Sequence, residues 1–166
     1  VVADQVVYVD VVNRKCWDRQ LQWQRKQGTD TEVKEEVCCN NMKKWSGSLL
    51  LLIPVRLGVQ KVNDSMYKDS LLAALRDERS VGIIGGLPNR ALYIVGHTDH
   101  NFLIGLDPHY PLPYVDQIQT PFPSENLIKS VCDRDIELLD VAELDASLAL
   151  GFIFSDYEQF CVWTES

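Results

Sequence analysis

Residues 80–106, SVGIIGGLPNRALYIVGHTDHNFLIGL, decide the fold. They contain three runs rich in β-branched, aromatic and leucine side chains, and such runs are typical of β-strands. The predicted strands are Ser80–Ile84, Ala91–His97 and Asn101–Leu106. Gly85–Asn89 separates the first two strands and Thr98–His100 the second two, and both segments carry residues that favour turns. The stretch therefore predicts three consecutive antiparallel strands joined by short connections.

More strands and helices are predicted on both sides of this meander. The unbroken apolar run Ser48–Arg56 is typical of a strand that is buried on both faces, and Asn63 can cap a helix over residues 64–77. At the start of the chain we predict a strand at 5–12 and then a polar insertion at 13–47 that is partly helical or mobile. After the meander we predict a proline-rich loop at 110–124, a strand at Leu148–Phe154 and a terminal helix. A capping box from Ser155 to Glu158 opens this helix. Mainly strands, with helices before and after the meander, predict an α+β domain with an antiparallel sheet.

Length, composition and charge limit the class of protein. The chain has 166 residues, of which 46% are hydrophobic, enough for one packed domain or a large part of one. No apolar run approaches the roughly 20 residues that span a bilayer. The net charge is −8, so nucleic acid is not expected as the main ligand. The acidic surface suits a basic protein partner, or it simply keeps the protein soluble.

The cysteine and histidine patterns do not predict a metal site. The chain has five irregularly spaced cysteines: Cys16, Cys38, Cys39, Cys132 and Cys161. There is no C-x-x-C pair, so zinc is not expected, and we predict reduced thiols in a cytoplasmic protein. His97, Asp99 and His100 lie on one turn, but no fourth ligand is evident. The chain also starts without Met on strand-like sequence, so we expect it to be cut from a longer protein.

The run Asp107-Pro108-His109 is the strongest candidate for chemistry. It follows the apolar strand that ends at Leu106. In extended chain, residues i and i+2 point to the same side, so the Asp107 carboxylate can accept a hydrogen bond from the His109 imidazole. A nucleophile at the other ring nitrogen would complete a catalytic triad. The alternative is a turn in which Asp107 caps backbone N–H groups and His109 is solvated.

Four further motifs give this tripeptide a context, and together with it they form a series of five. In chain order they are Leu51–Gly58, Val81–Asn89, Leu92–Gly96, Leu106–His109 and Val141–Ser147 running into Gly151-Phe152. In this order and at this spacing, the set closely resembles the C-terminal part of the autophagins, the autophagy cysteine proteases that process GABARAP-type ubiquitin-like modifiers. The resemblance covers roughly residues 48–165, is weaker over 1–12 and is absent over the insertion.

The resemblance implies a papain-like fold and a thiol protease without a cofactor. Autophagins cleave modifier precursors after a C-terminal glycine and release modifiers from membrane lipid, so the membrane is involved only through the lipidated substrate. By this resemblance His109 is the general base toward cysteine and the later acid toward the leaving amine, and Asp107 orients it. The expected partners are the modifier and the missing N-terminal half of the protease.

The resemblance also implies a lid and substrate contacts. The segment Gly85, Gly86, Leu87, Pro88 and Asn89 matches the loop that covers the family's active site, with Pro88 as the lid residue. Two glycines permit positive φ and suit a moving loop, whereas a plain hairpin turn is the alternative. Without Lys-Ser/Thr after the glycines, a phosphate-binding loop is poorly supported. Arg56 and Val59 are candidate substrate contacts, or Arg56 is a strand-end arginine paired with an acid.

One part of the family pattern is missing. The family's nucleophile lies in a Gly-Trp-Gly-Cys segment, and nothing in this sequence matches it. The chain alone is therefore expected to lack peptidase activity and, without the other half, to expose an apolar face and self-associate. Two alternatives stay open: a modifier-binding module or pseudoenzyme without chemistry, and an unrelated α+β domain. The preferred modifier and the role of residues 13–47 stay open as well.

Overall fold

The computed structural model describes residues 2–3, 6–27, 45–109 and 136–165. It divides into two compact units. One unit combines Val1–Val55 with Gly151–Ser166, and the other is Arg56–Leu150. The predicted loop at 110–124, together with Cys38, Cys39 and Cys132, lies outside the described residues.

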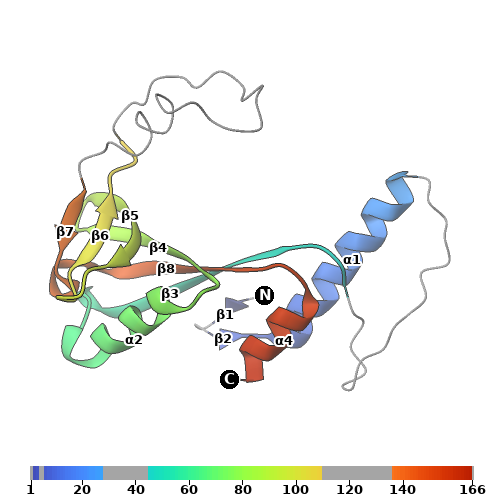
Figure 1. Cartoon of the computed structure of the whole chain (residues 1–166), viewed down its shortest axis with the longest axis horizontal. Helices are drawn as coiled ribbons and strands as arrows, with labels where there is room; N and C mark the ends of the chain where they lie inside the picture. Colours follow the sequence, from blue (N-terminus) through green and yellow to red (C-terminus); the bar gives the residue numbers. More distant parts are fainter. Residues whose placement is uncertain (1, 4–5, 28–44, 110–135, 166) are drawn as a thin grey trace. The chain divides into compact units, whose positions relative to one another are not determined.

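An open sheet of six strands, in the order β3-β8-β4-β5-β6-β7, forms the main layer of the described residues (Figure 1). Its strands are β3 (Leu49–Lys61), β4 (Ser80–Leu87), β5 (Arg90–His97), β6 (Leu103–Leu106), β7 (Glu137–Leu139) and β8 (Asp145–Phe154). The β4, β5, β6 and β7 ladder is antiparallel throughout. The predicted meander is therefore confirmed, and β3 and β8 are longer than predicted.

The second unit packs helix α2 (Asp64–Arg76) on one face of the meander. In the register Ile83 pairs with Ile94 and Leu103 with Leu139, so these side chains share a face. All four are buried, as are Leu71 and Leu72 of α2. The short helix η1 (Val141–Glu143) follows β7, and a capping box of Asp140 and Glu143 caps its N-terminus. Burial of aliphatic side chains between helix and sheet is the main stabilising term here.

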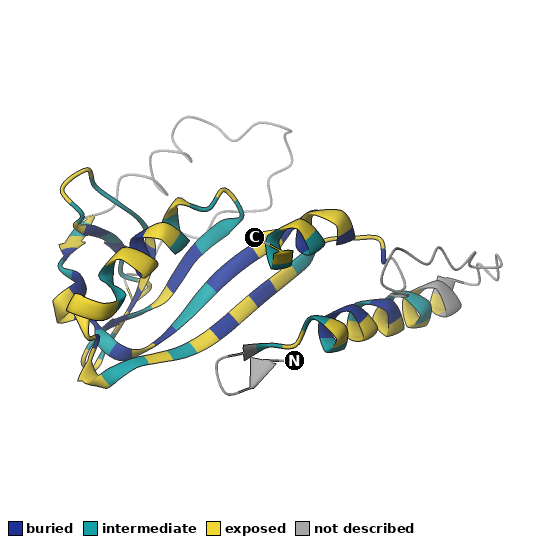
Figure 2. Ribbon diagram, turned by 90° about the horizontal axis from the view of Figure 1, so that it is seen from below, coloured by how far each residue is buried: buried dark blue, intermediate teal, exposed yellow. Residues whose placement is uncertain are grey.

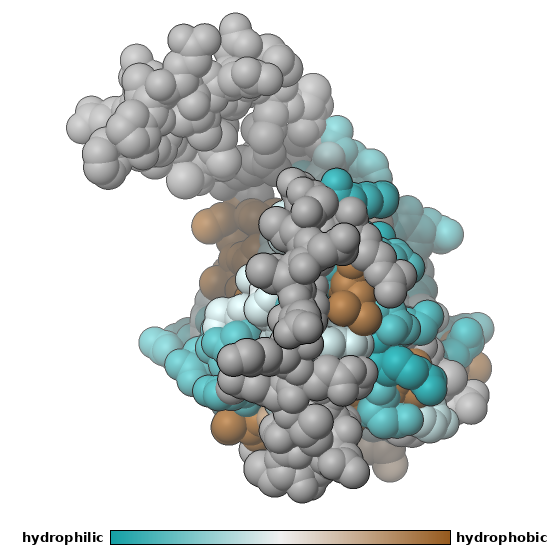
Figure 3. All heavy atoms as spheres, turned by 90° about the vertical axis from the view of Figure 1, so that its right-hand side faces the viewer, coloured by the Kyte–Doolittle hydropathy of each residue, from teal (hydrophilic) through white to brown (hydrophobic). Residues whose placement is uncertain are grey.

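The opposite face of this meander carries apolar side chains that α2 does not cover. Ile84 and Tyr93 are cross-strand partners and are both exposed. Leu138, which pairs with Ile104, is exposed as well. On the side of the molecule drawn in Figure 3, hydrophobic residues also reach the surface, in separate areas between hydrophilic ones. Exposed apolar side chains on adjacent strands are typical of a surface that another element covers.

The connection between β4 and β5 differs from the loop predicted at Gly85–Asn89. Gly85, Gly86 and Leu87 belong to β4, and Leu87 pairs with Arg90. This leaves a tight turn of two residues, in which Pro88 fixes a negative φ and Asn89 has φ 65°, as in a type II turn. At Gly86, with φ +135°, an added Cβ would lie 2.2 Å from the Arg90 carbonyl oxygen, so only glycine fits.

The first unit holds an aromatic cluster. Trp45 contacts Tyr157 edge-on, with ring centroids 5.9 Å apart, and Phe160 at 6.4 Å. Both partners belong to helix α4 (Tyr157–Glu165). The Trp45 Nε1–H donates a 3.0 Å hydrogen bond to Oδ1 of Asn13, which is 3% exposed. Exposed and buried residues alternate over the first part of β3, whereas most residues of β8 are buried or half-buried (Figure 2).

The strand predicted at residues 5–12 is wrong. Helix α1 (Val9–Gln27) begins there, after the short strands β1 (Val2–Ala3) and β2 (Val6–Val7). The backbone N–H groups of Val11 and Val12 donate to the Tyr8 carbonyl, which starts the helix. Val12, Asn13 and Trp17 are buried at helical spacing, so packing overrides the strand preference of valine. Residues 13–27 of the segment predicted as a partly helical or mobile insertion are therefore helical.

The terminal helix is confirmed, but its cap lies one residue later than predicted. The Asp156 carboxylate accepts the Gln159 N–H at 2.9 Å, and the Gln159 side chain accepts the Ser155 N–H at 2.9 Å. A carboxylate next to the first turn also interacts favourably with the helix dipole. Within the part of the chain that the structure describes, no helix is both long and apolar enough to cross a membrane.

Candidate active site

Asp107 and His109 form a hydrogen-bonded pair just beyond the end of β6. The His109 Nδ1 lies 2.8 Å from Asp107 Oδ1, and the His109 backbone N–H donates to the same oxygen at 2.9 Å. Because an ionised carboxylate only accepts, this contact requires a proton on Nδ1. The structure thus combines the turn cap of one interpretation with the side-chain pair of the other. The carboxyl is 12% exposed and the imidazole 66%, so the ring is open to a reactant.

Arg90 binds the other oxygen of the same carboxylate. Its Nε–H and Nη2–H groups donate to Asp107 Oδ2 at 3.2 and 2.8 Å. Its Nη1–H donates to Glu137 Oε1 at 2.8 Å, and Nη2 lies 2.8 Å from Glu137 Oε2. Arg90 begins β5 and Glu137 begins β7, on either side of β6. The carboxylate of Asp107 is therefore held by partners on both of its oxygens.

These contacts set the ionisation of the pair. The backbone N–H of His109 contributes most, followed by the side chains of Arg90 and His109, and together they lower the pKa of Asp107 from 3.8 to about 2. Hydrogen bonds to the charged form favour that form. In turn, the hydrogen bond to Asp107 raises the pKa of Arg90. At neutral pH Asp107 is an anion that can orient His109 and stabilise its imidazolium form.

The predicted lid residues and substrate contacts have defined places. Gly85 packs against Leu148, because an added Cβ would lie 2.2 Å from Leu148 Cδ2. Arg56 lies within β3, not just past it, and its guanidinium donates to the carbonyls of Gly58 and Val59 at 3.3 and 2.7 Å. Val59 is 82% exposed. The turn residues are joined to Asp107 through Arg90, the residue that follows Asn89.

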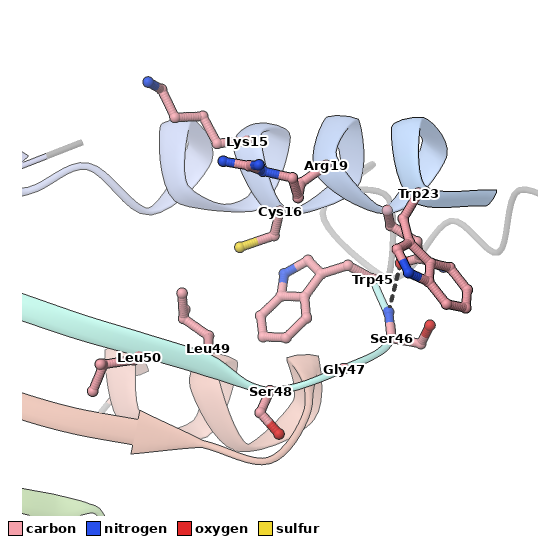
Figure 4. A pocket seen from close by; sticks show the side chains of 11 residues that line it. Lys15, Cys16, Arg19, Trp23, Trp45, Ser46, Gly47, Ser48, Leu49 and Leu50 are labelled. Carbon is pink, nitrogen blue, oxygen red and sulfur yellow. Dashed lines mark hydrogen bonds between the residues drawn. The ribbon is translucent and has the colours of Figure 1, made fainter. Parts of the chain in front are cut away.

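Two of the cysteines, Cys16 and Cys161, lie in the described residues, and both are partly exposed. Cys16 projects from α1 toward the start of β3 and lines a groove of about 640 Å³ with Trp45 and Leu49 (Figure 4). Burial raises the pKa of the Cys16 thiol. An activated cysteine needs the opposite shift, since the thiolate is the nucleophile.

The turn that carries His97, Asp99 and His100 is held by backbone hydrogen bonds. His97 Nδ1 lies 2.8 Å from the Thr98 carbonyl, and the Thr98 N–H donates to the Phe102 carbonyl at 2.8 Å. Among the described residues, no group of three or more His, Cys, Asp or Glu side chains is placed to hold a metal ion.

Sequence reasoning missed Arg90 and Glu137. Leu87 pairs with Arg90 across the hairpin, so Arg90 lies at the end of the sheet where β6 finishes. The spacing of the turn residues could have predicted this position of Arg90. Glu137 follows a long segment that gives no register, so its pairing with Gly105 had no sequence signal.

Comparison with known proteins identifies the family. The family described as the peptidase C54 catalytic domain matches residues 1–166. The chain belongs to this family. The match extends over residues 1–47, where the motifs had predicted a weak resemblance or none, and it includes helix α1.

The relatives of this C54 chain include several named cysteine proteases. It is 34% identical over 116 residues to the probable cysteine protease ATG4 of Chaetomium globosum, covering 69% of this chain and 25% of that protein. It is 36% identical to cysteine protease ATG4D of Xenopus laevis (68% and 23% covered) and 29% identical to ATG4A of the same species (99% and 41%). The chain thus spans a quarter to two-fifths of these relatives.

These findings confirm two of the predictions. The resemblance to the autophagins is confirmed, because the relatives are ATG4 cysteine proteases. The α+β papain-like fold is also confirmed, since the C54 chain has an antiparallel sheet with flanking helices.

Proposed function

We propose that Asp107 and His109 are the acid–base pair of a cysteine endopeptidase of autophagy. The observation that carries this proposal is the 2.8 Å bond from His109 Nδ1 to Asp107 Oδ1, with the imidazole exposed. With Nδ1 bonded to the carboxylate, Nε2 takes the proton of a cysteine thiol and later returns it to the leaving amine. Asp107 orients the ring and stabilises the imidazolium.

The proposed substrate is a GABARAP-type ubiquitin-like modifier, cleaved after its C-terminal glycine and released from lipid by the same chemistry. The names of the relatives, cysteine protease ATG4, support this class. Gly85–Asn89 is the proposed lid, and its tight turn carries Pro88 beside Arg90. Arg56 and the exposed Val59 are the proposed substrate contacts. The proposed site of action is the cytoplasm, with membrane contact only through the lipidated substrate.

The nucleophile is proposed to come from outside this sequence, so the chain alone has no peptidase activity. The raised pKa of Cys16 supports this, because that thiol is not activated. The partner would be the nucleophile-bearing half of the protease. The exposed apolar face with Ile84, Tyr93 and Leu138 supports a covering partner. The same face would make the isolated chain self-associate.

Reconstitution tests this proposal. A GABARAP-type precursor with a C-terminal tag is incubated with the chain, with the nucleophile-bearing N-terminal part of an ATG4 relative, and with both together. We expect cleavage only when both parts are present, and we expect His109→Ala in the chain to abolish it. His100→Ala is the matched control, because this exposed histidine lies on the β5–β6 turn, and it should leave the rate unchanged.

Two results would contradict the proposal in different ways. Cleavage by the pure chain would refute the missing nucleophile. Binding of the modifier without cleavage in the mixture would favour the alternative, a modifier-binding module or pseudoenzyme that does no chemistry.

A further inference from the structure

The two carboxylate oxygens of Asp107 have different partners: His109 binds Oδ1 and Arg90 binds Oδ2. Oδ1 receives both bonds from His109, through the ring and the backbone N–H. Oδ2 receives both bonds from Arg90, through Nε–H and Nη2–H. A carboxylate bonded on one oxygen alone can rotate about its last torsion, which is broad for aspartate. With the guanidinium on Oδ2, that rotation is stopped and Oδ1 stays on the imidazole.

Glu137 holds Arg90 from the other side. Ile94, Gly105 and Glu137 are aligned across β5, β6 and β7, and Asp107 lies two residues further along β6 in the direction of Arg90. Asp107 is therefore situated between the levels of Glu137 and Arg90 along the sheet. The Nη1–H bond to Glu137 Oε1 fixes the far end of the guanidinium. The planar fork of arginine suits two carboxylates at once, and lysine offers no such geometry.

The negative charges of Asp107 and Glu137 also favour a cation between them. Among the described residues, the charged groups that face Asp107 are the imidazole of His109, the guanidinium of Arg90 and, beyond it, the carboxylate of Glu137. Without Arg90, two carboxylates would share the strand ends with no cation between them, and each would make ionisation of the other harder. The pair at the sheet end therefore depends on Arg90 for both its geometry and its charge.

Building on the proposed function of Asp107 and His109, we propose that Arg90 is a positioning residue for this pair: it fixes Asp107 Oδ2 so that Oδ1 stays directed at His109, and it ties the β4–β5 turn to the pair. The tie follows from the chain itself, because Arg90 is the residue that directly follows the turn Pro88–Asn89. A displacement of that turn would act on the Asp107 carboxylate through one side chain. Stability is a poor explanation for Arg90, because its side chain is 40% exposed and exposed ion pairs contribute little.

Nuclear magnetic resonance on the unmodified chain gives the first test. The Arg90 Nε–H is followed together with the carboxyl carbons of Asp107 and Glu137 from pH 7 to pH 1, because the range must extend below the pKa of Asp107. Nε donates to Asp107 and Nη1 to Glu137, so the two groups report on different carboxylates. We expect the Nε–H signal to change with the midpoint of Asp107. A Nε–H signal that follows Glu137, or that stays constant while Asp107 titrates, would overturn the proposal.

Variants give the second test. Arg90→Gln is expected to raise the titration midpoint of Asp107 by about 1 pH unit, and Arg90→Lys by less, because lysine keeps the charge but loses the fork. Arg79→Gln is the matched control: Arg79 also binds an aspartate through Nε–H and Nη2–H, which donate to Asp77 Oδ1 at 2.7 Å and Oδ2 at 2.8 Å. It should leave Asp107 unchanged.

The outcomes separate this inference from the proposed function. A lower melting temperature of Arg90→Gln with an unchanged Asp107 midpoint would make Arg90 merely structural and refute the inference. The titration needs no cleavage, so intact coupling in a chain that fails the reconstitution assay would refute the proposed function alone.

Discussion

The end of the meander at Asp107 and the aromatic cluster at Trp45 are each organised by a side-chain hydrogen bond, in opposite surroundings. Asp107 binds an imidazole that is 66% exposed, and every member of its network carries or can carry charge. Trp45 binds Asn13 in a site where both residues are buried and neutral. The first bond fixes a protonation state, and the second satisfies a polar group so that the core can close over it.

This difference separates the control of protonation from the control of stability in one chain. Exposed charged contacts add little to the free energy of unfolding, but they determine which atom carries a proton. Buried aromatic contacts add much to that free energy and leave protonation untouched. Changes at the Asp107 end should therefore affect reaction rates, and changes in the cluster should affect unfolding.

The largest expected effect is that of Asp107→Asn on catalysis. The amide keeps the shape of the carboxylate but no longer enforces the proton on Nδ1 of His109. In serine-protease triads the equivalent change lowers kcat about 10⁴-fold, and we expect a similar loss in the reconstituted protease. The measurement is the rate of precursor cleavage at saturating substrate. The urea midpoint of the variant at pH 7 should fall only by the contribution of the Asp107 carboxylate, and a loss of folding that accounts for the lost rate would contradict the catalytic role.

The largest expected effect on stability is that of Phe160→Ala. This side chain is fully buried between Phe154, Trp45 and Trp163, with ring centroids 5.2 to 6.4 Å away. Truncating a buried phenylalanine removes transfer free energy and leaves a cavity, so we expect a loss of about 3–5 kcal/mol in the free energy of unfolding. Urea unfolding followed by tryptophan fluorescence measures it. A change below 1 kcal/mol would show that the cluster is not a stabilising core.

Asn13→Ala should cost less than Phe160→Ala and act through hydrogen bonding. It removes the acceptor of the Trp45 Nε1–H, which would then be buried without its partner. An unsatisfied buried donor costs about 1–3 kcal/mol. The matched control is Gln20→Ala, because Gln20 accepts the Ser46 N–H in an exposed contact at 2.7 Å. Equal losses for the two variants would contradict the role given to burial.

Local patterns were sufficient for the meander and insufficient for helix α1. Strands β4, β5 and β6 alternate apolar residues between turns that are strong local signals, so both type and order were predictable. Residues 5–12 are rich in valine, and only the burial of Val12 and Trp17 against distant partners makes the segment from Val9 helical. Trp45, the hydrogen-bond partner of Asn13 in this helix, lies 32 residues away along the chain, and no local pattern contains that information.

The candidate site divides in the same way. The contact of Asp107 with His109 spans two residues, so the local sequence was enough to predict it, although the two side chains meet across a turn and not in extended chain. The contacts of Asp107 with Arg90 and of Arg90 with Glu137 span 17 and 47 residues. They depend on strand register, and the register between β6 and β7 is established across a long connection that carries no pattern.

The smallest expected effect is a pH dependence of stability that Asp107 alone contributes. Its pKa is lowered to about 2 in the folded chain, against 3.8 for the free group, so the unfolded chain takes up this proton first as the pH falls. The stabilisation is present above about pH 4 and is lost between pH 4 and pH 2. Urea midpoints of the chain and of Asp107→Asn should therefore differ at pH 5 and converge toward pH 2.5. Parallel curves over this range would mean that the carboxylate is not held by its partners in solution, and the contrast with the neutral Trp45 site would lose its basis.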